Sequence, residues 1–206
     1  MLFREDKMKL IVITQENIIE NESAAINLLF DEGLSILHLR KPNYSEADIE
    51  TLIDDINPKY REKIVLHDHF QLAEKFKLKG IHLNRRNPNP PIHSKLSISK
   101  SYHDLDSVKQ SAKYNYVFLS PIFDSISKQG YNQAFSNEEL TVARDNGIIN
   151  NKVIALGGIS METIPIAAQY SFGGVAVLGA LWGNFVNDKD YRSLINRFKQ
   201  LQNICN

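Results

Sequence analysis

The chain has 206 residues, and its 24 basic residues balance 24 acidic ones. This neutral balance does not point to nucleic acid or an anionic membrane as a partner. No apolar run approaches the roughly 18 residues of a membrane helix, and the charged leader, residues 1–8, lacks the apolar core of a signal peptide. The single cysteine, Cys205, can form no internal disulfide, which fits a reducing compartment. We therefore expect one cytoplasmic domain over residues 1–206.

Short apolar runs of strand length alternate with helical patterns along the whole chain. The strand-like runs lie at 10–14, 35–40, 63–68, 80–83, 95–99, 115–120, and at the starts of 152–160 and 173–181. Helices are expected at 23–32, 45–56, 71–77, 108–113, 136–147, 161–170 and 191–201. Ser45 with Asp48 and Ser136 with Glu139 form capping boxes, and Asp104 can cap the helix that runs through 108–113.

Eight strand-like runs separated by helices predict an α/β protein with a closed (β/α)₈ TIM barrel. Four prolines make a helix implausible in residues 84–94, so a proline-rich loop replaces the fourth helix. A doubly wound open sheet is the alternative. It usually has fewer strands and carries a glycine-rich fingerprint at its first turn, where this chain has TQENII.

The last two strand-like runs both end in glycine, at KVIALGGIS and GGVAVLGAL. In a TIM barrel the loops after strands 7 and 8 commonly hold a phosphate on backbone N–H groups. The candidate phosphate-binding residues are Gly157, Gly158, Gly179 and Ala180.

The other strands end in polar residues, and strand ends form the rim where a barrel places its active site. Alternation puts His38 and Arg40 on one side of the second strand, with Leu37 and Leu39 facing the helices. Other polar residues at the rim are His67, Asp68, His82, Ser99, Ser101 and His103. Neutral imidazole suits proton transfer near pH 7. A zinc site is the sharper alternative, but these histidines lack close-spaced pairs such as HxH, so we do not favour zinc.

Charged and hydroxyl side chains beside this rim suit an anionic substrate. Arg40 is a candidate clamp for a carboxylate or phosphate, with Lys41 beside it. The alternative is that both residues are only a charged, solvent-exposed strand end. Ser125, Ser127 and Lys128 lie in the polar loop after the sixth strand, next to the expected phosphate site. We count His38, Lys41, His67, Ser101 and these three loop residues as candidate substrate-binding residues.

Six segments resemble the thiamine phosphate synthase and TenI family in order and spacing. They are HLRKP, LHDHFQLAEKFKLKGIHL, ISKSYHDLDSV, YVFLSPIFDSISKQG, VIALGGIS and GVAVLGAL. The resemblance covers about Lys9 to Trp182 and implies a barrel that binds the thiazole phosphate of thiamine biosynthesis. The resemblance implies that the phosphate of this ligand lies against the backbone at Gly157, Gly158 and Gly179.

Two branches of this family differ in their chemistry. The synthase joins hydroxymethylpyrimidine diphosphate to thiazole phosphate and needs Mg²⁺ held by aspartates. The resemblance keeps one of these, Asp68, and Lys128. It places Asn87 at the second aspartate, Arg85 and Arg86 beside it, and Pro42 where the family has a lysine. The metal site expected of a synthase is thus compromised.

The TenI branch moves a proton to aromatise a thiazole carboxylate phosphate, and it needs no metal. The resemblance puts its catalytic histidine on His103, with Arg40 as the carboxylate clamp. We therefore expect a metal-independent thiazole tautomerase. The alternatives are a thiamine phosphate synthase with a weakened Mg²⁺ site at Asp68, and a non-catalytic phosphate-binding regulatory barrel. Similar family members form dimers, so a homodimer is possible here.

Overall fold

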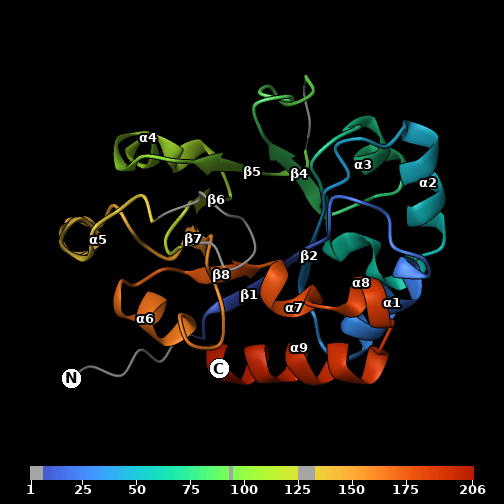
Figure 1. Cartoon of the computed structure of the whole chain (residues 1–206). Coiled ribbons are helices and arrows are strands. Elements are labelled where there is room, and N and C mark those ends of the chain that lie inside the picture. Colours follow the sequence, from blue (N-terminus) through green and yellow to red (C-terminus); the bar gives the residue numbers. More distant parts are fainter. Residues whose placement is uncertain (1–6, 93–94, 125–132) are drawn as a thin grey trace.

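Eight parallel strands close into a barrel in which each strand pairs with the next and β8 pairs with β1 (Figure 1). The structure is a computed structural model that describes residues 7–92, 95–124 and 133–206. The strands are β1 (Lys9–Ile13), β2 (Ile36–Leu39), β3 (Ile64–Leu66), β4 (Gly80–Leu83), β5 (Ser97–Tyr102), β6 (Tyr116–Leu119), β7 (Val153–Leu156) and β8 (Gly174–Val177). The predicted (β/α)₈ barrel is confirmed.

Helices follow most strands and cover the outside of the barrel. They are α1 (Glu22–Asp31), α2 (Glu46–Asp54), α3 (Gln71–Lys75), α4 (Leu105–Lys109), α5 (Asn137–Asp145), α6 (Ile164–Gln169), α7 (Gly179–Trp182), α8 (Phe185–Asp188) and α9 (Tyr191–Cys205). Two short 3₁₀ helices, Pro58–Lys63 and Ser111–Lys113, precede β3 and β6. No α-helix in these described ranges is long and apolar enough to cross a membrane.

The predicted caps explain where several helices begin. Ser45 and Ser136 each form the expected capping box, with Asp48 and Glu139 respectively, and the Asp104 side chain accepts the N–H of Ser107. At the other end of the chain, α9 lies alongside the bottom of the barrel in Figure 1, and the Cys205 carbonyl accepts the N–H of Met8 at 3.0 Å.

Three predicted elements differ from the observed ones. The fifth strand continues to Tyr102 instead of ending at residue 99, because its polar serines face the barrel interior and pair there. The helix expected to run from its cap at Asp104 through residue 113 is split into α4 and a 3₁₀ turn, and α6 begins three residues later than expected. Between β4 and β5 the described residues contain no helix, as the prolines predicted.

The barrel interior is apolar on one side and polar on the other. Its apolar side is a cluster of Ile11, Ile13, Tyr116, Phe118, Ile154 and Ala176. On the polar side, β2 to β5 place His38, His67, His82 and Ser99 inside, all buried. Leu37 and Leu39 pack outward against the helices, as the alternation predicted. The chemistry-bearing residues thus lie in the polar half.

Candidate active site

The loops after β7 and β8 form the candidate phosphate site. Gly157 and Gly158 both have positive φ angles, +94° and +63°, and Gly179 begins α7. A Cβ on Gly158 would lie 2.4 Å from the carbonyl oxygen of Asp124, so only glycine fits where the loop after β6 crosses. Since β7 and β8 are paired, the two glycine loops lie side by side.

This pair of loops offers backbone N–H groups to an anion. Among the described residues, none accepts a hydrogen bond from the N–H of Gly158 or Ile159. Gly179 and Ala180 lie in the first turn of α7, where N–H groups have no acceptor within the helix. Gly158, Gly179 and Ala180 are each partly exposed. These groups can surround a phosphate, as the sequence predicted.

Three of the four rim histidines meet inside the barrel. His38 Nδ1 lies 2.9 Å from His67 Nε2, and His38 Nε2 lies 2.7 Å from the Tyr116 hydroxyl. His82 bonds Ser99 through Nδ1 at 2.9 Å and Ser101 through Nε2 at 2.8 Å. The His67 and His82 rings stack with their centroids 4.3 Å apart. Tyr116 and Ser99, which the sequence analysis gave no role, complete this network.

Burial keeps all three of these imidazoles neutral. Burial, with a smaller contribution from the nearby Arg40 guanidinium, lowers the pKa of His82 to about 3. Burial also holds the pKa values of His38 and His67 well below the usual range, helped by the neighbouring histidines and, for His67, by Arg40 and Arg86. Neutral imidazoles can each donate one hydrogen bond and accept another.

The three histidines are also close enough to suggest a metal site. One ring nitrogen from each lies within 4.8 Å of the others, a convergence that the sequence spacing did not reveal. However, both nitrogens of His82 are bonded to serines, and its ring is stacked on His67 at 22°, so their in-plane lone pairs do not converge on one point. The arrangement fits a hydrogen-bond network better than tetrahedral zinc coordination.

Lys41 does not face the substrate side, contrary to the sequence interpretation. Its ammonium group donates to the carbonyls of Gln15 and Asn17 at 2.8 Å and to the Glu22 carboxylate at 2.7 Å. Both charged side chains are almost completely buried. With its three protons used inside the protein, Lys41 anchors the loop after β1 and has none left for a ligand.

Arg40 lies at the rim as predicted, next to the neutral histidines. Its Nη1 pairs with Glu16 Oε1 at 2.7 Å, and about a quarter of its side chain is exposed, at 27%. Its backbone N–H donates to Thr14, which fixes the end of β2 beside β1. The guanidinium is accessible and can exchange this surface ion pair for a substrate carboxylate.

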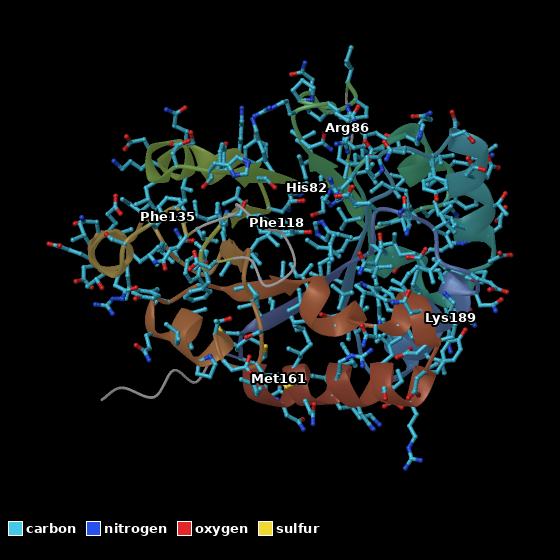
Figure 2. All side chains as sticks on the ribbon, viewed as in Figure 1. His82, Arg86, Phe118, Phe135, Met161 and Lys189 are labelled. Carbon is cyan, nitrogen blue, oxygen red and sulfur yellow. The ribbon has the colours of Figure 1, made fainter. Side chains whose placement is uncertain are left out.

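Asp68 is held by two side chains from the loop after β4. Arg86, labelled in the upper part of Figure 2, bonds both Asp68 oxygens at 2.9 and 3.1 Å. The Asn87 amide donates to Asp68 Oδ1 at 2.9 Å. Mg²⁺ prefers several oxygen ligands and is repelled by a neighbouring guanidinium. These residues therefore do not fit the Mg²⁺ site that a synthase needs.

His103 lies apart from the other three histidines, although all four were placed at the rim from the sequence. It is exposed, and it lines a groove between α4 and α5. Its Nδ1 is 2.9 Å from the Ser120 carbonyl oxygen, which can only accept, so in the neutral form of the ring Nδ1 carries the proton and Nε2 the lone pair. The next residue, Pro121, packs against Gly157. Ser120 and Pro121 therefore connect His103 to the glycine loop.

Of the remaining candidates, Ser101 is inside the barrel on His82, and Ser125, Ser127 and Lys128 lie outside the described residues. Sequence reasoning did not single out Tyr116 or Glu22, and it named Ser99 at the rim without a role. The alternation of Tyr116 with Phe118 and of Ser99 with Ser101 could have placed these residues inside the barrel. Nothing in the sequence signals that Glu22, in the first turn of a helix, is buried.

A family described as thiamine monophosphate synthase matches residues 10–181. The chain belongs to the thiamine phosphate synthase and TenI family. Curated relatives include a thiamine-phosphate synthase of Cronobacter sakazakii, which is 25% identical over 87% of this chain and 88% of its own length. Another is a putative thiamine-phosphate synthase 2 of Aquifex aeolicus, which is 24% identical over 76% of this chain and 88% of its own length. The family resemblance found in the sequence and the expectation that the protein is an enzyme of this family are confirmed.

The solved structures agree with this membership. A thiamine phosphate pyrophosphorylase from Bacteroides thetaiotaomicron is 42% identical, with a TM-score of 0.88 over 96% of this chain and 97% of that one. A thiamine phosphate pyrophosphorylase from Pyrococcus furiosus has a TM-score of 0.72 at 19% identity, which supports the fold alone. The relatives are named for the synthase reaction, which the sequence analysis placed second to the tautomerase.

Proposed function

We propose that this member of the thiamine phosphate synthase and TenI family binds thiazole phosphate and catalyses a proton transfer on it without a metal. The observation that supports a metal-free reaction is that Arg86 and Asn87 both hydrogen-bond the Asp68 carboxylate. The rim therefore presents positive charge and neutral imidazole where a metal-dependent reaction would need several oxygen ligands.

Each part of the substrate has a partner in this proposal. The phosphate lies on the backbone N–H groups at Gly157, Gly158, Gly179 and Ala180. A carboxylate on the thiazole pairs with Arg40. His103, whose Nε2 lone pair is free, acts as the general base and returns the proton as the acid. Residues of this chain thus supply the phosphate site, the carboxylate partner and the general base that the reaction requires.

The synthase reaction is the second candidate, and the names of the relatives favour it. Asp68 supplies one of the carboxylates that this reaction would use. The residues present do not complete a Mg²⁺ site, because Asn87 replaces a carboxylate and Arg86 pairs with the one that remains. The two candidates therefore separate on metal dependence.

Replacing Gly158 with alanine is expected to weaken thiazole phosphate binding at least about tenfold, which corresponds to about 1.4 kcal/mol. The new Cβ would collide with Asp124 and Phe123 and push the loop after β6 away from the phosphate. Isothermal titration in EDTA measures the affinity. Gly147→Ala is the matched control, because Gly147 also has positive φ, +69°, but nothing within 4 Å of the added Cβ.

Both variants are expected to lose about 1 kcal/mol of stability from the positive φ angle, and Gly158→Ala more because of the collision. Thermal melting separates this loss from the loss of binding. Unchanged affinity in a folded Gly158→Ala protein would contradict the proposed phosphate site.

A further inference from the structure

Hydrogen bonds tie the ends of β1 and β2 together at the rim of the barrel. The two strands pair in parallel, so these ends lie side by side (Figure 1). The Thr14 N–H donates to the His38 carbonyl at 3.0 Å, and the Arg40 N–H donates to the Thr14 hydroxyl at 3.0 Å. Thr14 is completely buried. The backbone of Arg40 is therefore fixed relative to the start of the loop after β1.

A buried ion pair fixes the next part of this loop. Lys41, just after β2, donates from its ammonium group to the carbonyls of Gln15 and Asn17, both at 2.8 Å. The same ammonium donates at 2.7 Å to the carboxylate of Glu22, the first residue of α1. Gln15 and Asn17 are the two neighbours of Glu16 in the sequence. The backbone of Glu16 is thus held on both sides from inside the protein.

The fixed loop presents the Glu16 carboxylate to the Arg40 guanidinium. Glu16 Oε1 lies 2.7 Å from Arg40 Nη1, with 40% of the Glu16 side chain and 27% of the Arg40 side chain exposed. Ion pairs this exposed are weak, because water and salt screen them. The carboxylate can therefore rotate into solvent while its backbone stays in place.

The inner side of the same guanidinium faces the neutral half of the barrel. Arg40 adds to the effect of burial in lowering the pKa of His82, so its charge reaches the interior. A carboxylate bound to Arg40 would be well placed beside the neutral imidazoles. A ligand without a carboxylate leaves the Glu16–Arg40 pair intact, whereas a ligand with one must displace Glu16. The ion pair therefore affects the two kinds of ligand differently.

We propose that Glu16 is a specificity-determining residue, which occupies Arg40 in the free protein and gives way only to the carboxylate of a ligand whose phosphate is already bound. A carboxylate tethered in this way has a high effective concentration at Arg40, which a small free anion lacks. Lys41 and Glu22 are positioning residues, because they hold the loop that carries Glu16. This inference rests on the proposed function, which assigns Arg40 to the substrate carboxylate.

Glu16→Gln tests the proposal, because it removes the charge and keeps the size of the side chain. Isothermal titration in EDTA compares thiazole carboxylate phosphate with thiazole phosphate, which lacks the carboxylate. We expect the variant to bind the carboxylated ligand about threefold to fivefold more tightly, the most that an exposed ion pair accounts for. Its affinity for thiazole phosphate should be unchanged. Glu20→Gln is the matched control, because it removes the same charge from an exposed position in the same loop.

The reaction of Arg40 with phenylglyoxal, followed by peptide mass spectrometry, tests the occupation of Arg40 without any thiazole ligand. We expect faster modification in Glu16→Gln than in the wild type, and no change in Glu20→Gln. An unchanged rate in Glu16→Gln would overturn the proposal. Equal affinity gains for both ligands would also overturn it, because they would reflect net charge alone. Faster modification in a protein that binds neither ligand would instead contradict the proposed function and the role of Glu16 in specificity.

Discussion

Acidification below pH 6.5 is expected to unfold this protein steeply, at a pH where most of its carboxylates are still ionised. His38, His67 and His82 are buried, and their folded pKa values lie below the unfolded value of 6.5, with that of His82 at about 3. The unfolded chain therefore binds more protons than the folded one in this range. Their contribution to stability is complete above pH 6.5 and is lost as the pH falls toward 3.

The size of the effect follows from the number of histidines. Each group that binds a proton only on unfolding changes the free energy of unfolding by about 1.4 kcal/mol per pH unit. Three such groups give about 4 kcal/mol per unit, a large fraction of the 5–15 kcal/mol that stabilises a typical domain. Urea unfolding between pH 7 and 5 measures this slope.

A pair of variants isolates the buried histidines. His82→Gln keeps groups that can bond Ser99 and Ser101 but cannot be protonated, so the slope should fall by about a third. His103→Gln is the control, because it removes a histidine that is exposed and leaves the barrel interior unchanged. Equal slopes in the wild type and His82→Gln would show that the barrel interior admits water and protons.

Removing either partner of the Lys41–Glu22 pair is expected to cost about 3–5 kcal/mol, because the other charge stays buried without compensation. Burial raises the pKa of Glu22 and lowers that of Lys41, and their mutual attraction opposes both shifts without cancelling them. Both shifts disfavour the charged forms. The pair therefore gains little net stability even though each partner depends on the other. Denaturant unfolding of Lys41→Met and of Glu22→Gln measures the loss.

The double variant Lys41→Met with Glu22→Gln is the control for this pair. Since it removes both charges, it should recover most of the stability that either single variant loses. Losses that simply add in the double variant would contradict the account. Phosphate binding should survive in the folded variants, because Lys41 uses its protons inside the protein.

The strands and the glycine loops could be predicted because their signals are local. A buried parallel strand is a short apolar run, and Gly157 and Gly158 follow such a run directly. The polar strand β5 was predicted too short, because Ser99 and Ser101 are stabilised by His82, a contact that depends on the neighbouring strand. Helix ends were predictable where a side chain caps them, as at Ser45 and Ser136.

The positions of the polar side chains around the rim could be predicted only in part. Alternation places His38 inside the barrel, but it does not say that its ring bonds His67 or that His103 lines a groove between α4 and α5. Lys41 follows Arg40 at a strand end and looks like a substrate ligand until Glu22 is found buried beside it. Such pairings depend on distances between elements, which spacing along one chain does not contain. The expected homodimer stays a prediction.

The metal dependence of turnover tests the central claim of a metal-free proton transfer most directly. The purified wild type is treated with EDTA and then offered the thiazole carboxylate phosphate tautomer, or thiazole phosphate with hydroxymethylpyrimidine diphosphate, each with and without Mg²⁺. We expect aromatisation of the tautomer at the same rate in EDTA and in Mg²⁺, and loss of that activity in His103→Ala. Formation of thiamine phosphate that requires Mg²⁺, with no acceleration of aromatisation, would contradict the account and assign the synthase reaction to this chain.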